Sequence, residues 1–225
     1  MTEETLYFSS DHIRIEARLA YNDSIQAPNA KVLLCSPHPF LGGDMDNNVL
    51  RQIKKNLVMN DFVVFRFNYR GIGMSGTDRD LHEDQKLFWE NSTCPAYEEN
   101  IYIDCQHAYT ILADIMETEW PVYIVGYSFG CLPAMQIAKK QKIMKLGLIS
   151  PPLGKWQIKV DDLDFKQQKK FFHAPDDFAC PEYEMQELYR DAAEPKSIQS
   201  FPDADHFFIG KEMELAKAVT EFLLT

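Results

Sequence analysis

Apolar, strand-like segments alternate with amphipathic, helix-like segments along most of this chain of 225 residues. After two strands within 5–21, strands are expected at 31–35, 62–67, 121–125, 145–150, 170–173 and 198–201, and helices at 47–60, 100–116, 132–138, 181–192 and 211–224. Short apolar runs without polar alternation are typical of strands that helices cover on both faces. The alternation therefore predicts an α/β fold with a mostly parallel sheet and helices on both of its faces.

The same pattern predicts one domain over residues 1–225, because a chain of this length can bury a single sizeable core. Two longer stretches, 77–97 and 151–169, lack a clear period and are expected to be loops. Long loops in compact domains are often lids or binding loops, so both are candidate lids. Neither stretch is long enough to form a large cap domain.

Charge and cysteine usage narrow the possible classes of function. The formal net charge of −11 argues against nucleic acid or an anionic membrane as a partner. The five cysteines are scattered and form no CxxC pair, which favours reduced thiols in a cytoplasmic protein. We expect no membrane span, and the first residues lack the basic and apolar parts of a signal peptide.

The segment Gly126-Tyr127-Ser128-Phe129-Gly130 carries the clearest indication of chemistry. It joins the expected strand at 121–125 to the expected helix at 132–138, and a glycine stands two residues to either side of the serine. This order describes a nucleophile elbow, a turn so tight that neighbouring positions have no room for side chains. The turn places the Ser128 hydroxyl at the head of a helix, where backbone N–H groups and the helix dipole favour negative charge.

A serine hydroxyl needs a base and an orienting acid before it can act as a nucleophile. The chain offers His206 before its last helix and the adjacent acids Asp176 and Asp177 after the strand at 170–173. Successive side chains at a strand end point in opposite directions, so only one of the two acids can meet His206. The order serine, acid, histidine along the chain is the order expected for this architecture.

With these segments in place, the chain resembles the α/β-hydrolase superfamily, in particular its small single-domain members related to dienelactone hydrolases. The resemblance extends from about residue 6 to 224 and rests on the segments 36–47, 68–76, 126–130 and 204–208. In 36–47, His-Pro and Gly-Gly stand where relatives carry a His-Gly oxyanion loop. In 68–76, Arg-Gly-x-Gly-x-Ser is similar to the family turn after the fourth strand.

The resemblance implies that Ser128 is the nucleophile, His206 the general base and Asp177 the acid. Asp176 stays an alternative for the acid, because Ala174 and Pro175 replace the usual residues of that loop.

The resemblance also implies an oxyanion hole formed by the backbone N–H groups of Phe40 and Phe129. Aromatic and apolar residues of the irregular stretches and of the motifs are expected to line a substrate pocket: Leu41, Phe88, Trp89, Trp156 and Phe207. No cofactor and no metal are expected. Asp203 and Asp205 beside His206 are interpreted as turn-forming residues.

These features predict a serine hydrolase that cleaves a small-molecule carboxylic ester or thioester through an acyl-enzyme. The same triad would also serve an acyltransferase or a ring-closing enzyme, and a non-catalytic binding protein with an inactive triad is a third hypothesis. The acids Glu98, Glu99, Asp104 and Asp114 are interpreted as a solvated helix face. The oligomeric state is left open.

Overall fold

A computed structural model describes residues 1–116, 119–156, 158 and 163–225. Within these residues, eight strands form one sheet in the order β1-β2-β4-β3-β5-β6-β7-β8. The strands are β1 (Thr2–Ser10), β2 (Ile13–Tyr21), β3 (Lys31–Cys35), β4 (Val63–Phe67), β5 (Val122–Tyr127), β6 (Lys145–Ile149), β7 (Gln168–His173) and β8 (Lys196–Ser200). The helices are α1 (Asn48–Met59), α2 (Leu81–Asn91), α3 (Pro95–Asp114), α4 (Cys131–Lys140), α5 (Glu182–Asp191) and α6 (Glu212–Leu224).

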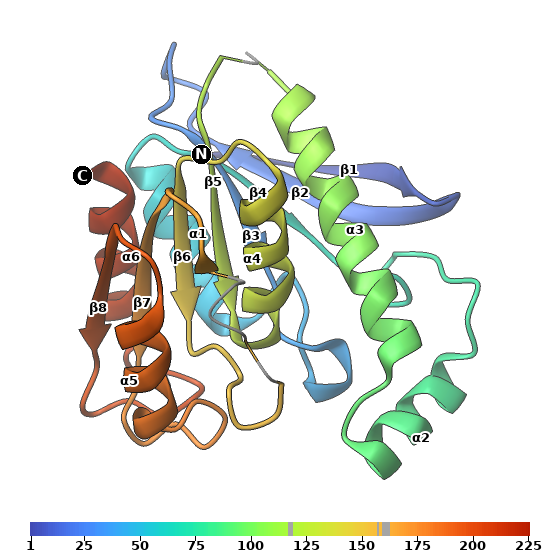
Figure 1. The fold of residues 1–225 in the computed structure, drawn as a ribbon. Coiled ribbons are helices and arrows are strands. Elements are labelled where there is room, and N and C mark those ends of the chain that lie inside the picture. The colour runs from blue at the N-terminus through green and yellow to red at the C-terminus, as the bar shows by residue number, and fades with distance from the viewer. Residues whose placement is uncertain (117–118, 157, 159–162) are drawn as a thin grey trace.

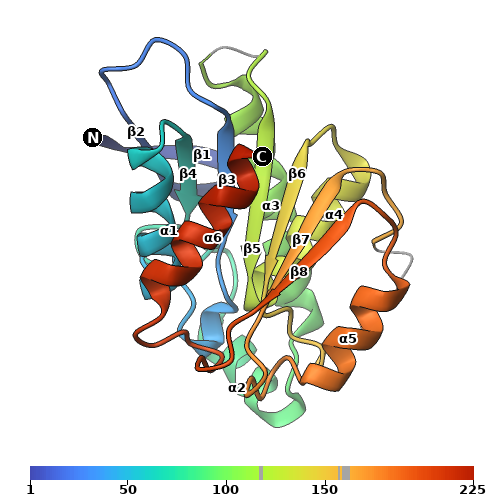
Figure 2. The ribbon, with the colours of Figure 1, turned by 90° about the vertical axis from the view of Figure 1, so that its left-hand side faces the viewer.

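Strands β3 to β8 run parallel, whereas β1 and β2 form an antiparallel hairpin that joins the sheet at β4. Helices α1 and α6 pack together over one face, and α3 and α4 cover the other, as Figures 1 and 2 show from two sides. The predicted α/β fold with a mostly parallel sheet and helices on both faces is confirmed.

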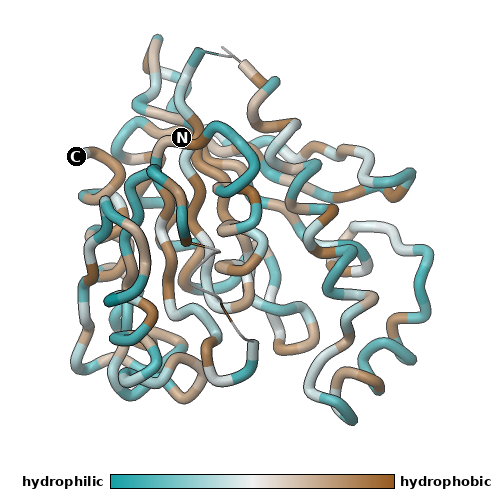
Figure 3. Tube along the Cα trace, in the orientation of Figure 1, coloured by the Kyte–Doolittle hydropathy of each residue, from teal (hydrophilic) through white to brown (hydrophobic). Residues whose placement is uncertain are grey.

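The apolar strands point successive side chains into two separate cores. Ile124 of β5 lies in the core under α3 and α4, and its neighbour Val125 lies in the core under α1 and α6. This explains why the strands read as continuous apolar runs, since both of their faces are covered. In Figure 3 the hydrophobic colours accordingly gather along the central strands.

The expectation of an irregular segment at 77–97 was wrong, because this segment contains α2 and the first residues of α3. Asp80 caps α2 by accepting hydrogen bonds from the N–H groups of His82 and Glu83. Pro95 opens α3 five residues before the predicted start of that helix, at a position where its missing N–H costs no hydrogen bond. The predicted lid at 77–97 is therefore mostly helical.

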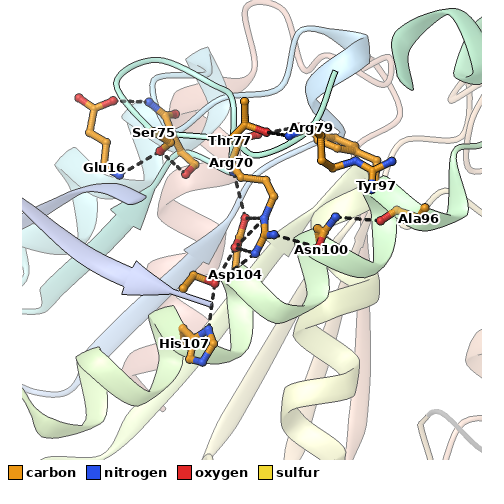
Figure 4. A network of polar contacts seen from close by, with 12 residues as sticks. Glu16, Arg70, Ser75, Thr77, Arg79, Ala96, Tyr97, Asn100, Asp104 and His107 are labelled. Atoms are coloured by element: carbon orange, nitrogen blue, oxygen red, sulfur yellow. Dashed lines mark hydrogen bonds and ion pairs between the residues drawn. The ribbon is translucent and has the colours of Figure 1, made fainter. Parts of the chain in front are cut away.

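The predicted solvated face of α3 also needs correction. Glu99 and Asp114 are exposed, but Glu98 is buried and Asp104 is fully buried. Figure 4 shows Asp104 beneath Arg70, whose guanidinium donates to its carboxylate at 2.6 Å. This ion pair joins the turn after β4 to α3, so the arginine of the Arg-Gly-x-Gly-x-Ser motif has a structural role.

The second candidate lid, 151–169, falls partly outside the described residues, at 157 and 159–162. In its described part, Leu163 and Phe165 are buried in the core, and β7 begins at Gln168. Among the described residues, no additional domain covers the carboxyl ends of the strands. None of the helices in the described residues has the length and apolar character needed to cross a membrane.

Candidate active site

Ser128 lies at the junction of β5 and α4, in a single 3₁₀ turn formed by residues 128–130. Its backbone has a φ of 52°, in the left-handed region that L-residues rarely adopt. A Cβ at Gly130 would collide with the Cys35 carbonyl, and one at Gly126 would strike the start of α4. Both glycines are therefore required by close backbone packing, and the segment has the geometry of a nucleophile elbow.

Three side chains from separate loops meet at this point. The loop between β8 and α6 carries His206, whose Nε2 lies 3.1 Å from the Ser128 Oγ. The loop between β7 and α5 carries Asp177, whose Oδ1 and Oδ2 lie 2.8 and 2.9 Å from the His206 Nδ1. All three side chains are buried. The structure thus brings together the serine, histidine and acid that the sequence singled out.

The neighbouring Asp176 is exposed and forms no part of this arrangement. Asp177 instead accepts hydrogen bonds from the N–H groups of Ala179 (2.8 Å) and Cys180 (3.0 Å) as well as from His206. Burial alone would raise the pKa of Asp177, but the hydrogen bond and charge of His206 and the Ala179 amide outweigh it and lower the pKa. The carboxylate is thereby held ionised and oriented toward the imidazole.

The loop between β3 and α1 contains a 3₁₀ turn, Pro39–Leu41. The Phe40 N–H donates to the Nδ1 of His38 at 3.1 Å, so the imidazole engages the amide expected to bind an oxyanion. A Cβ at Gly43 would collide with the Pro37 carbonyl, so the loop can turn this sharply only with glycine there. To bind an oxyanion, the Phe40 N–H would have to break its hydrogen bond to the His38 Nδ1 and form one to the oxyanion instead.

His38 is fully buried among aromatic rings. It stacks on Phe88 with ring centroids 4.5 Å apart, and it lies nearly perpendicular to the Phe129 ring with centroids 4.8 Å apart. Burial, reinforced by the positive charge of Lys155, lowers the pKa of His38 to about 3. The ring is therefore neutral at neutral pH, and since Nδ1 accepts a hydrogen bond, its proton is on Nε2, 3.8 Å from Glu98.

A cavity of about 340 Å³ opens in front of Ser128. Its lining residues come from the loops around the carboxyl ends of the strands: Pro37, Leu41, Gly42, Gly43, Asn47, Tyr127, Ser128, Pro152, Gly154, Lys155, Trp156, Phe178, Ala179, His206 and Phe207. The walls are mainly apolar, and a few polar groups converge at one point, as in many small-molecule sites.

Three of the five predicted pocket residues, Leu41, Trp156 and Phe207, line this cavity. The other two do not. Phe88 is completely buried behind it, against His38, and Trp89 on the next position of α2 is 63% exposed to solvent. Because neighbouring helix residues point about 100° apart, one aromatic side chain of this pair faces the core and the other faces water.

Comparison with known proteins agrees with this architecture. An uncharacterized protein of Rickettsia prowazekii (strain Madrid E) is 28% identical over 236 residues, covering 98% of this chain and 88% of the relative. No protein-family model matches the chain. Among solved structures, an alpha-beta serine hydrolase homologue from Coxiella burnetii superposes with a TM-score of 0.82 at 21% identity, over 98% of this chain and 97% of the other. The chain has the α/β-hydrolase fold.

A second structure with this fold, from Xanthomonas campestris, is described as a member of the serine hydrolases without a lid. It superposes with a TM-score of 0.75 at 19% identity, over 98% of this chain and 93% of the other. The α/β-hydrolase fold places the loops after β3, β5, β7 and β8 at one edge of the sheet, which explains why distant segments converge on Ser128.

Among the site residues not predicted from the sequence, two aromatic ones lie directly beside His206. Phe178 follows Asp177 directly, is 72% exposed, and places its ring centroid 5.1 Å from that of His206. Its position next to the predicted acid was a local indication that could have found it. Tyr127 donates its hydroxyl to the His206 carbonyl at 2.7 Å, a contact between residues 79 positions apart that no local pattern reveals.

Proposed function

We propose that this protein is a serine hydrolase that cleaves a carboxylic ester or thioester through an acyl-enzyme on Ser128. The observation that carries the proposal is the continuous line of hydrogen-bond distances from Ser128 Oγ through the His206 imidazole to Asp177. This line ends at an elbow that opens on an apolar cavity. A nucleophile, a base within reach and a group that orients the base are the parts that acyl transfer to serine requires.

In the first half of the reaction, the His206 Nε2 takes the Ser128 proton while Oγ forms a bond to the substrate carbonyl carbon. The tetrahedral intermediate collapses by breaking the bond to the alcohol or thiol, which receives the proton from His206. In the second half, His206 removes a proton from water, whose oxygen attacks the acyl carbon. Collapse returns the proton to Ser128 and releases the carboxylic acid.

Asp177 stabilises the imidazolium that forms in both halves and keeps Nδ1 protonated, so that Nε2 faces Ser128 as a base. The lowered pKa of Asp177 supports this role, because an ionised carboxylate is needed at the pH where the imidazole is neutral.

The oxyanion of each tetrahedral intermediate would lie against the N–H of Phe129 at the head of α4. The Phe40 N–H is the second proposed donor, and it would leave the His38 Nδ1 as the oxyanion forms. One such donor is typically worth about 3 kcal/mol in the transition state.

The cavity supports a substrate of small to medium size. Its volume of about 340 Å³ lies near the lower end of the range for small-molecule sites, and its walls are mainly apolar. Leu41, Phe178 and Phe207 combine a position on the lining with high exposure, so they form an apolar rim at its mouth. We therefore propose acyl groups of a few carbon atoms or one ring as substrates. The five buried, unpaired cysteines fit a reducing compartment, and we propose the cytoplasm.

The experiment that tests this proposal is labelling of the folded protein with a fluorophosphonate, which forms a stable adduct with activated serines. We expect an adduct on Ser128 that is lost in Ser128→Ala, together with hydrolysis of p-nitrophenyl butyrate that the same substitution abolishes.

A further inference from the structure

Tyr127 is the residue before Ser128 and the last residue of β5. Its side chain is almost completely buried, and its phenol reaches across to the loop between β8 and α6. There the hydroxyl donates to the backbone carbonyl of His206 at 2.7 Å, the distance of a well-formed hydrogen bond. The ring also lies beside the His206 ring, with centroids 5.8 Å apart.

The other polar contacts of the His206 loop are mostly local. The Phe207 N–H donates to the Asp205 side chain, and the Phe208 N–H to the Asp205 carbonyl. Asn48 reaches the Phe207 carbonyl only at 3.5 Å. At the start of the loop the Phe201 N–H donates to the His173 carbonyl of β7 at 2.8 Å. Among the described residues, the Tyr127 hydroxyl makes the shortest of these hydrogen bonds to another element, and it makes it at His206 itself.

Taken with the function proposed above, on which it rests, this contact has a mechanical consequence. Tyr127 is covalently joined to the nucleophile and hydrogen-bonded to the backbone of the base. We infer that Tyr127 is a positioning residue, whose hydroxyl fixes the His206 backbone relative to the elbow and so maintains the distance between Nε2 and the Ser128 Oγ.

The Tyr127 hydroxyl is suited to act as a permanent hydrogen-bond donor to the His206 carbonyl. Burial, and then the negative charge of Asp177, raise the pKa of Tyr127 far above its ordinary value. The phenol therefore keeps its proton throughout the pH range in which His206 acts as a base, and the tether does not depend on pH there.

The test is Tyr127→Phe, which removes the hydroxyl and keeps the ring. A small displacement of a catalytic group can lower its rate by up to about a hundredfold, so we expect kcat for p-nitrophenyl butyrate to fall about tenfold with KM unchanged. Tyr109→Phe is the matched control. Its hydroxyl on α3 donates to the Lys142 carbonyl at 3.3 Å, away from the cavity, so the substitution removes a longer bond of the same hydroxyl-to-carbonyl type without affecting kcat.

A second readout is independent of turnover. The proton on His206 Nδ1, shared with Asp177, should give a low-field NMR resonance, identified by its loss in His206→Gln. We expect Tyr127→Phe to shift or broaden this resonance and Tyr109→Phe to leave it in place. An unchanged resonance and unchanged kcat in Tyr127→Phe would overturn the inference, as would equal effects of both substitutions. Absence of ester hydrolysis in the wild-type protein, together with the resonance change in Tyr127→Phe, would contradict the proposed function and leave the positioning role supported.

Discussion

Asp177 is held at both of its carboxylate oxygens by His206 and at Oδ1 also by two backbone amides, those of Ala179 and Cys180. Such multiple donation to one carboxylate favours its charged form and fixes its orientation. Asp176, one residue earlier, points to solvent. The family resemblance favoured Asp177, but the sequence could not exclude Asp176, because the choice depends on the path of the chain after β7.

This difference gives a prediction for a matched pair of substitutions. Asp177→Asn leaves the shape of the site intact but removes the charge that stabilises the imidazolium, so kcat should fall by about 10⁴. Asp176→Asn, an identical chemical change one residue away, should stay within about twofold of wild type. Steady-state hydrolysis of p-nitrophenyl butyrate measures both, and circular dichroism checks the fold. A larger loss in Asp176→Asn would reverse the assignment of the acid.

At the scale of elements, α3 is the helix whose sequence was hardest to interpret. The helix-start signals of α2 and α3, Asp80 and Pro95, stand in the sequence, but the prediction of an irregular segment at 77–97 made no use of them. The burial of Glu98 and Asp104 was not readable in the sequence, because their partners come from elsewhere. Arg70, the partner of Asp104, follows β4, and Trp156, whose indole N–H donates to Glu98 at 3.3 Å, follows β6. No helical period can announce a partner from another element. The elbow, in contrast, was predictable because all of its requirements are local.

Because of the Arg70–Asp104 ion pair, we expect a substitution at Asp104 of α3 to lower the free energy of unfolding strongly. Asp104→Ala would leave the buried guanidinium without its carboxylate, so the free energy of unfolding should fall by about 3–5 kcal/mol. Glu99→Ala, at an exposed position of the same helix, should change it by less than about 0.5 kcal/mol. Urea unfolding measures both values. Similar effects of the two substitutions would mean that the ion pair does not hold the turn after β4 to α3.

Across the whole molecule, burial leaves two histidines with lowered pKa values, His38 and His173, close to the carboxyl ends of β3 and β7. Each is neutral in the folded protein at a pH where the unfolded chain would bind a proton. The contribution of these histidines to the free energy of unfolding is therefore complete above the ordinary histidine pKa of 6.5, and it decreases as the pH falls below that value.

For His38, whose pKa is about 3 in the folded protein, the decrease should approach about 1.4 kcal/mol per pH unit below pH 6.5. His38→Gln should flatten the dependence of unfolding free energy on pH between 6.5 and 4.5. His12→Gln, at an exposed position, should leave the slope unchanged. Urea unfolding across this range gives both slopes, and a wild-type slope retained in His38→Gln would rule out this source of acid sensitivity.

In the proposed function the whole fold assembles an activated nucleophile at Ser128. The mass of the protein after reaction with a fluorophosphonate, followed by peptide mapping, measures this activation. We expect one adduct per folded chain on Ser128, slower labelling in His206→Gln, and none in Ser128→Ala or in urea-unfolded wild type. An unmodified folded protein, or an adduct that persists in Ser128→Ala, would contradict the proposed function.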